Sequence, residues 1–140
     1  MSTIRCDIVS AQTEIFSGPV TMLIASGVHG ELGIFPRHAP LMTRLKPGAV
    51  RVLLPDDEEA VFFVGGGILE VMPHLITVLA DTAIRADDLD EAAAVRAREE
   101  AERALKDRTG EMEIAEAMRR LTEALAQLRA LEELRKKLKR

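Results

Sequence analysis

The first 87 residues alternate between hydrophobic and polar side chains with the two-residue period of β-strands. Ile4, Cys6 and Ile8 alternate with polar neighbours, and the same period recurs near residues 20–24. Glycine, proline and aspartate mark turns between these short runs. The pattern predicts an antiparallel β-sandwich of about ten strands over residues 1–87, in which Cys6 is a small buried residue.

Near residue 87 the spacing of hydrophobic positions changes to the three- and four-residue period of helices. Beyond this point proline is absent and glycine occurs once. Asp88 and Glu91 predict a capped start for a first helix of about 19 residues. Asp107–Gly110 then forms a turn, and a second helix begins at about Glu111. Residues 88–140 are therefore predicted to form an antiparallel two-helix hairpin, which makes the fold class α+β.

The two predicted helices carry hydrophobic stripes of different width. The first stripe is mostly alanine, which lets another helix approach closely. The second is a ridge of larger side chains that a two-helix hairpin cannot bury alone. This ridge is expected to pack on the sandwich, on another chain, or on both at different times, and a permanent dock within the chain fits the periodicity equally well. The stripes are Leu89, Ala93, Ala97, Ala101 and Ala104 in the first helix, and Ile114, Met118, Leu121, Leu125, Leu128, Leu131, Leu134 and Leu138 in the second.

The segment Gly30–Gly48, GELGIFPRHAPLMTRLKPG, is too irregular for ordinary core and too hydrophobic for a solvent-facing loop. Its glycines and prolines pin the backbone in turns and extended stretches. On local pattern alone, two short strands joined by tight turns would explain it. The charged residues at its rim favour a surface that binds a partner. The hydrophobic members are Leu32, Ile34, Phe35, Leu41 and Met42, and the rim residues are Glu31, Arg37 and His38.

Composition excludes several classes of function. Aromatic residues make up 3% of the chain, without Trp or Tyr, and the net charge is −4, so a nucleic acid partner is not expected. The single cysteine cannot form an internal disulfide, which suits a reducing compartment. No hydrophobic run approaches the ~20 residues needed to cross a bilayer, and a signal pattern is absent at the N-terminus. A soluble protein without direct membrane insertion is expected.

The C-terminal end is basic. Its last twelve residues hold six Lys or Arg against two Asp or Glu. Such a charge also stabilises the end of its own helix through the macrodipole. The functional interpretation is contact with an acidic surface of a partner. The contact set would be Arg135, Lys136, Lys137, Lys139 and Arg140.

Catalytic and metal-binding patterns are scarce. Gly65–Gly67 precedes a strand pattern rather than the lysine and helix of a phosphate-binding loop. His29, His38 and His74 lie on separate turns without the spacing of a metal site. An Asp81–Arg85 pair would be structural, at the junction of sandwich and helices. No metal, no cofactor and no catalytic residue are expected, and a metal-dependent enzyme is the least favoured alternative.

Five motifs follow one another along the chain: Gly30–Pro36, His38–Leu41, Lys46–Gly48, Gly66–Val71 and Val78–Ala83. Together they resemble the epsilon subunit of bacterial F-type rotary ATP synthase. Their order and spacing and the length of the chain agree with that family, strongly over residues 1–90 and weakly over the helices. In the second helix the best local match is Ala126–Arg129.

This resemblance implies a non-catalytic subunit at the cytoplasmic face of the bacterial inner membrane. The sandwich would bind the gamma subunit of the central stalk and the polar loops of the c-ring, through Glu31, Phe35, Arg37, His38, Leu41 and Met42 at one ring-facing end. The hairpin would inhibit ATP hydrolysis when it extends, with its basic end against acidic helices of the catalytic beta subunits. Leu121, Leu125 and Leu128 would hold it when it is folded down.

The sequence leaves one alternative from another class and departs from its relatives at one motif. The alternative is a sandwich adaptor whose helices form homo-oligomeric coiled coils. The departure lies in Leu89–Ala94, where family members that bind ATP carry an arginine at the position of Ala93. On the second helix Glu123 and Gln127 stand where those relatives have arginines. ATP is therefore not expected to be a ligand, because a triphosphate needs cationic donors.

Overall fold

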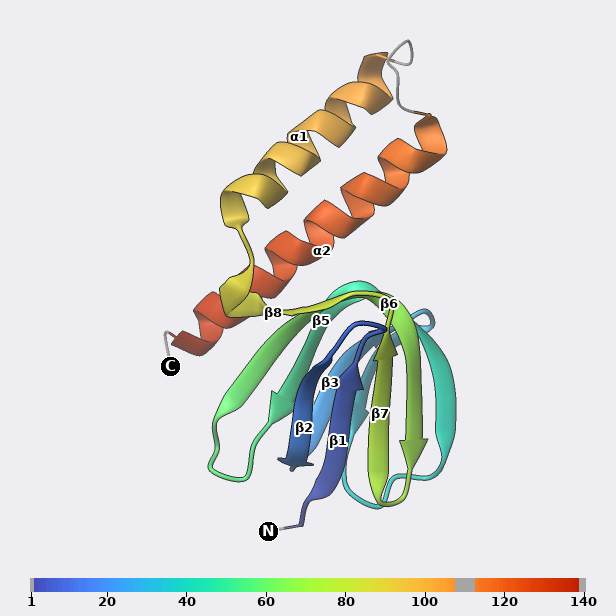
Figure 1. Cartoon of the computed structure of the whole chain (residues 1–140), viewed down its shortest axis with the longest axis vertical. Helices are drawn as coiled ribbons and strands as arrows, with labels where there is room; N and C mark the ends of the chain where they lie inside the picture. The colour runs from blue at the N-terminus through green and yellow to red at the C-terminus, as the bar shows by residue number, and fades with distance from the viewer. Residues whose placement is uncertain (1, 108–112, 139–140) are drawn as a thin grey trace.

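The computed structural model describes residues 2–107 and 113–138, with the side chains of Lys137 and Leu138 excepted. A β-sandwich carries a helical hairpin at one end, which confirms the predicted α+β fold class (Figure 1). The chain runs through eight strands before the helices. They are β1 (Ile4–Val9), β2 (Glu14–Val20), β3 (Met22–Gly27), β4 (Gly30–Ile34), β5 (Leu41–Leu53), β6 (Glu59–Met72), β7 (Leu75–Ala80) and β8 (Ala83–Arg85).

The strand number is lower than the expected ten because β5 and β6 each serve in both layers. They have 13 and 14 residues and arch together over the end of the sandwich (Figure 1). At the bend Pro47 of β5 lies opposite Gly65 of β6. Gly66 and Gly67 follow with φ of 102° and 142°, a region that side chains disfavour. The three glycines therefore bend a continuous strand and do not end it.

One strand pair also differs from the antiparallel expectation. The neighbours in the sheet run in the order β2-β1-β7-β6-β5-β3-β4, with β8 paired to β6. All pairs are antiparallel except β1 with β7, which are parallel. The alternating side chains of these strands form the core, and Cys6 is fully buried in it as predicted. Burial, aided by the negative charge of Asp7, raises the pKa of the Cys6 thiol to about 12, so the thiol is inert.

The hairpin consists of α1 (Glu91–Asp107) and α2 (Ile114–Leu138), preceded by a short 3-10 turn, η1 (Ala86–Asp88). The expected cap at Asp88 is wrong, because Asp90 accepts a hydrogen bond from the amide of Ala93 at 3.1 Å. Asp88 belongs to the 3-10 turn instead. The predicted turn at Asp107–Gly110 and the predicted helix start at Glu111 fall almost entirely outside the described residues.

Alanines, rather than leucines, are the most deeply buried residues in the described part of the hairpin. Ala94 and Ala101 of α1 and Ala117 and Ala124 of α2 are almost fully buried. Small side chains at seven-residue spacing let two helices approach closely. The predicted ridge on α2 is only partly covered. The predicted stripe on α1 is partly wrong, because Ala101 is buried as expected but Ala93 and Ala97 are exposed and Ala94 is buried instead. Ile114, Met118 and Leu125 are exposed, and Leu121, Leu128 and Leu134 are half-buried.

Candidate functional site

The hairpin packs on the sandwich around the aromatic side chain of Phe63. Phe63 of β6 is 2% exposed and packs against Ala126 and Ala130 of α2, with Leu89 and Ala49 beside them. The preceding residue, Phe62, points to the opposite face of the strand and belongs to the sandwich core. We call this contact the Phe63 seat. Because alanine side chains bury little area, the apolar contact between the seat and α2 is modest.

An ion-pair network lies beside this seat. The Nε of Arg51 on β5 donates to Glu59 of β6 in a short contact, and its other end lies 3.6 Å from Glu133 of α2. The hydrogen bond with Glu59 raises the pKa of Arg51, and the charges of Glu133 and Glu31 raise it further against the opposing effect of burial. The network therefore joins the sandwich to the C-terminal half of α2.

The predicted basic contact set is partly engaged within the chain. Arg135 pairs with Glu91 at the start of α1, and Lys136 lies 3.6 Å from Glu133 on its own helix. The backbone of Lys137 continues α2, but its side chain is outside the described set. Lys139 and Arg140 lie outside the described residues. In this arrangement Arg135 is held by its own hairpin, and its release would depend on the hairpin changing shape.

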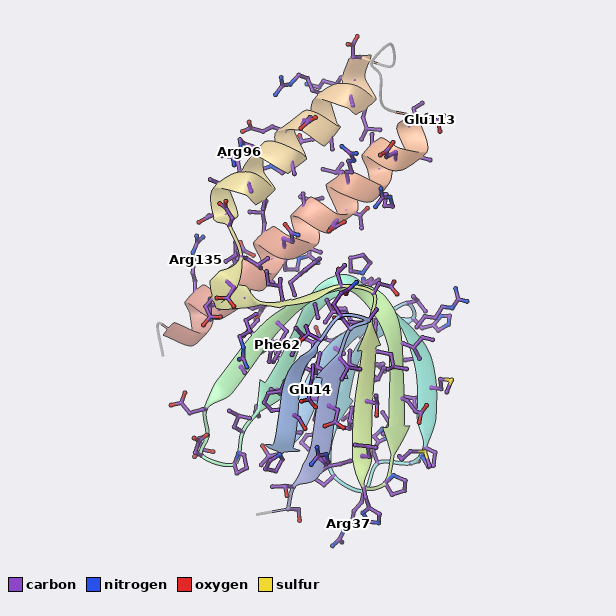
Figure 2. All side chains as sticks on the ribbon, viewed as in Figure 1. Glu14, Arg37, Phe62, Arg96, Glu113 and Arg135 are labelled. Carbon is purple, nitrogen blue, oxygen red and sulfur yellow. The ribbon has the colours of Figure 1, made fainter. Side chains whose placement is uncertain are left out.

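The structure separates Glu31 from the other residues of the predicted ring-facing end. Glu31 lies at the start of β4 and, with Lys46 and Arg129 of α2, lines a hollow of about 330 Å³ between sandwich and hairpin. Arg37 points from the opposite end of the sandwich (Figure 2). The expectation of one surface containing both is therefore wrong. β4 connects the two sites, and its length carries the chain from the hairpin end toward the far end.

The remaining predicted residues gather at that far end. Phe35 and Met42 are 56% and 66% exposed, whereas Leu41 packs against the core. Met42 lies with Pro40, Leu41 and Met72 around a shallow depression. His38 donates from Nδ1 to the carbonyl of Ala39 at 2.7 Å, which fixes its ring on the loop. A hydrophobic surface with Arg37 and Glu70 nearby results, suited to binding another protein.

Two exposed hydrophobic residues of the sheet were not among the site residues predicted from the sequence. Ile68 of β6 and Leu79 of β7 are paired across the strands and are 39% and 47% exposed. Together with Val9 of β1 they line a depression on the outer face. Their alternation with buried neighbours matches ordinary strands. The sequence could have identified them, because each is a hydrophobic residue at a strand position predicted to face outward.

The hollow between the two helices is poor in cations. Glu100, Arg120, Glu123 and Gln127 supply its charged and amide groups, around a volume of about 200 Å³. Arg120 already bonds Glu116 at 2.8 Å. Two carboxylates against one arginine make this hollow unfavourable for a polyphosphate.

Within the described part of the chain, the other candidate groups do not come together as a catalytic arrangement. Arg85 donates to the carbonyl of Ile15 at 3.3 Å and lies over the ring of Phe62, so the expected partner Asp81 is not the one it contacts. Across residues 2–107 and 113–138, no group of three or more His, Cys, Asp or Glu could hold a metal ion. Neither α1 nor α2, as far as they are described, is long and apolar enough to span a bilayer.

Comparison with known proteins covers almost the whole chain. Residues 3–86 match the family model for the ATP synthase, delta/epsilon chain, beta-sandwich domain, and residues 87–132 match the model for its long alpha-helix domain. The ATP synthase epsilon chain of Stenotrophomonas maltophilia (strain K279a) is 62% identical over 139 residues, 99% of each chain. The ATP synthase epsilon chain of Nitrosococcus oceani is 58% identical over 136 residues, 97% of each chain.

Solved structures share the fold at lower identity. One chain in the cryo-EM structure of the Euglena gracilis mitochondrial ATP synthase, OSCP/F1/c-ring, superposes with a TM-score of 0.72 at 19% identity. The match covers 97% of this chain and 81% of that one. The two matched family models and the curated relatives agree over the sandwich and the helices. The chain therefore belongs to the ATP synthase delta/epsilon chain family.

Proposed function

We propose that the chain is a non-catalytic subunit of the central stalk of a proton-translocating ATP synthase, which couples the rotor to the catalytic head and inhibits ATP hydrolysis through its C-terminal helices. The observation that carries the regulatory part is the modest contact between hairpin and sandwich, in which Phe63 packs against two alanines of α2, with Ala49, Leu89 and the Arg51–Glu133 ion pair beside them. Exposed Ile114, Met118 and Leu125 on α2 provide a surface for a second packing. The relatives' name, ATP synthase epsilon chain, supports the assignment to the complex.

Two partners require two surfaces, and the sandwich offers one at each end. The far end, with Phe35, Met42 and Met72 exposed, suits a lasting contact with the gamma subunit, because permanent interfaces are the more hydrophobic ones. The opposite end lies beside the hairpin, and there Glu31 and Lys46 line the hollow next to α2; their charges suit the polar loops of a c-ring. A structural relative comes from a preparation described as the central stalk and c-ring of the Tetrahymena thermophila mitochondrial ATP synthase, with a TM-score of 0.52.

The proposed division of labour follows the chain. Residues 1–87 bind gamma and the ring, and residues 88–140 regulate. When the hairpin extends, its basic end, with Arg135 and Lys136 at the described part, meets acidic helices of the beta subunits. The complex would hold the chain at the cytoplasmic face of the bacterial membrane as a peripheral subunit.

A substitution at the far end tests the proposed contact with gamma. Replacing Met42 with glutamate should weaken binding of purified gamma at least about tenfold, because it places a charge in a hydrophobic interface. Val28→Glu is the matched control, since Val28 is also exposed but lies on the turn between β3 and β4. Calorimetric titration of each variant with gamma gives the affinities. Equal affinities for the two variants would refute the assignment of this surface.

ATP binding provides a separate prediction. Titration of ATP into the purified chain should give no stoichiometric micromolar binding, because Glu100 and Glu123 in the interhelical hollow repel a polyphosphate. Asp90 of the family's ATP motif is already engaged as the cap of α1. Calorimetric detection of a micromolar site that Arg120→Ala abolishes would contradict this prediction and make the hairpin a nucleotide sensor.

A further inference from the structure

The ion pair between sandwich and hairpin has an unusual arrangement of partners. Arg51 on β5 reaches Glu133 on α2 at 3.6 Å, and the two side chains are 22% and 25% exposed. Each also has a partner within its own part of the chain. Arg51 bonds Glu59 on the neighbouring strand, and Glu133 lies 3.6 Å from Lys136 on the same helix. Departure of α2 would leave both charges paired.

This redundancy matters because breaking a partly buried ion pair is costly when one charge is left alone. Here the loss is limited to a contact that is a quarter exposed and therefore screened by salt. The pair between Arg135 and Glu91 is different, since both residues belong to the hairpin and would move with it. The Phe63 seat is apolar and responds little to moderate salt. Arg51 therefore contacts Glu133 of the hairpin and also has a second partner, Glu59, within the sandwich.

We propose that Arg51 is the positioning residue of a reversible latch, which holds α2 on the sandwich through Glu133 and remains bound to Glu59 when the helix leaves. The proposal rests on the proposed function in that release of the hairpin is taken as its regulatory movement. It adds a contact that adjusts the docked population and predicts that this population depends on ionic strength.

Thiol labelling in the full chain measures docking directly. Ala126 is 8% exposed against Phe63, so a cysteine at this position reacts with a maleimide only when α2 lifts. Cys6, fully buried in the sandwich, reports any opening of the sandwich in the same sample. In the Ala126→Cys background, Glu133→Gln should raise the labelling rate at position 126 about threefold, as expected for losing a partly exposed ion pair. The labelling rate of Cys6 should not change.

The control is Glu132→Gln, which makes the same charge change at the adjacent, exposed position and should leave the rate unaltered. Raising the salt from about 0.05 M to about 0.5 M should speed labelling in the Ala126→Cys background but have little effect once Glu133→Gln is present. Adding Arg51→Gln to Glu133→Gln should not raise the labelling rate at position 126 any further. The labelling rate of Cys6 shows whether Arg51→Gln has also loosened the sandwich. The proposal is overturned if Glu133→Gln has no effect, or if Glu132→Gln has an equal one.

The measurement uses the isolated chain, so it is independent of the ATPase. A latch confirmed by labelling, together with ATP hydrolysis that is indifferent to Glu133→Gln in the assembled enzyme, would refute the regulatory function and leave the latch standing. Unchanged labelling, together with inhibition that disappears on removal of the hairpin, would refute the latch alone.

Discussion

Removal of residues 88–140 is expected to raise ATP hydrolysis by the assembled enzyme about twofold or more, because an inhibitory state that holds at least half of the complexes can no longer form. Binding of gamma should be unchanged, since the far-end residues Phe35, Met42 and Met72 all precede the cut. The measurement is the steady-state rate of ATP hydrolysis with and without the hairpin, alongside the amount of subunit retained in the purified complex.

The shortened chain should fold because the larger core cluster lies wholly within the strands, from Ile4 to Ala80. Its new surface is the one that the hairpin covered, chiefly Phe63. A single exposed aromatic is common on soluble proteins. A shortened chain that is insoluble, or that is lost from the complex, would show that sandwich and hairpin are not separable parts. Normal assembly with unchanged hydrolysis would instead refute the inhibitory role.

The sandwich was predictable because burial in a sheet follows directly from alternation. Ile4, Cys6 and Ile8 are buried as their spacing required. Strand number was not predictable in the same way. Glycine and proline usually end a strand, but opposite Pro47 the glycines of β6 let the ladder continue around a bend. Whether a turn signal breaks pairing or bends it depends on the neighbouring strand, which local sequence does not specify.

The candidate site was less predictable, for two physical reasons. On α2 both the leucines and the alanines recur with helical spacing, and periodicity cannot decide which stripe faces the sandwich. Phe63 faces α2 at this point, and two alanines of α2 pack against its ring. The second reason is that residues close in sequence can be far apart in space when a strand separates them. Glu31 and Arg37 are six positions apart, yet the direction of β4 places them at different ends of the sandwich.

Ion pairs could not be predicted from the sequence either. The sequence shows how many basic residues lie at the C-terminal end, but it does not show which acidic residues they pair with. Arg135 meets Glu91 only because the hairpin brings the start of α1 beside the end of α2. Similarly, nothing in the sequence around Arg51 indicates its role, which follows from its ion pairs with Glu59 on β6 and Glu133 on α2. Long-range contacts of this kind are the part of a site that a sequence pattern does not contain.

Replacing Phe63 with alanine is expected to have the opposite effect on hydrolysis from removing the hairpin. The change removes the aromatic seat without altering the hairpin, and should weaken docking by about 2–3 kcal/mol, below the full cost of truncating a buried phenylalanine because part of its contact is with the sandwich. The ratio of released to docked hairpin rises by roughly the corresponding factor of 30–150. Under the proposed function this favours the extended state, so the assembled enzyme should hydrolyse ATP more slowly.

The neighbouring residue supplies the matched control. Phe62 points into the core, where its ring meets that of Phe16 edge to face with centroids 5.8 Å apart. Phe62→Ala should therefore lower the free energy of unfolding of the sandwich by about 3–5 kcal/mol, a loss that chemical denaturation measures and that Phe63→Ala should largely avoid. In a chain ending at residue 87, Phe63→Ala should leave hydrolysis unchanged, since no hairpin remains to be released. Faster hydrolysis by full-length Phe63→Ala would mean that the docked hairpin, rather than the extended one, is the inhibitory form.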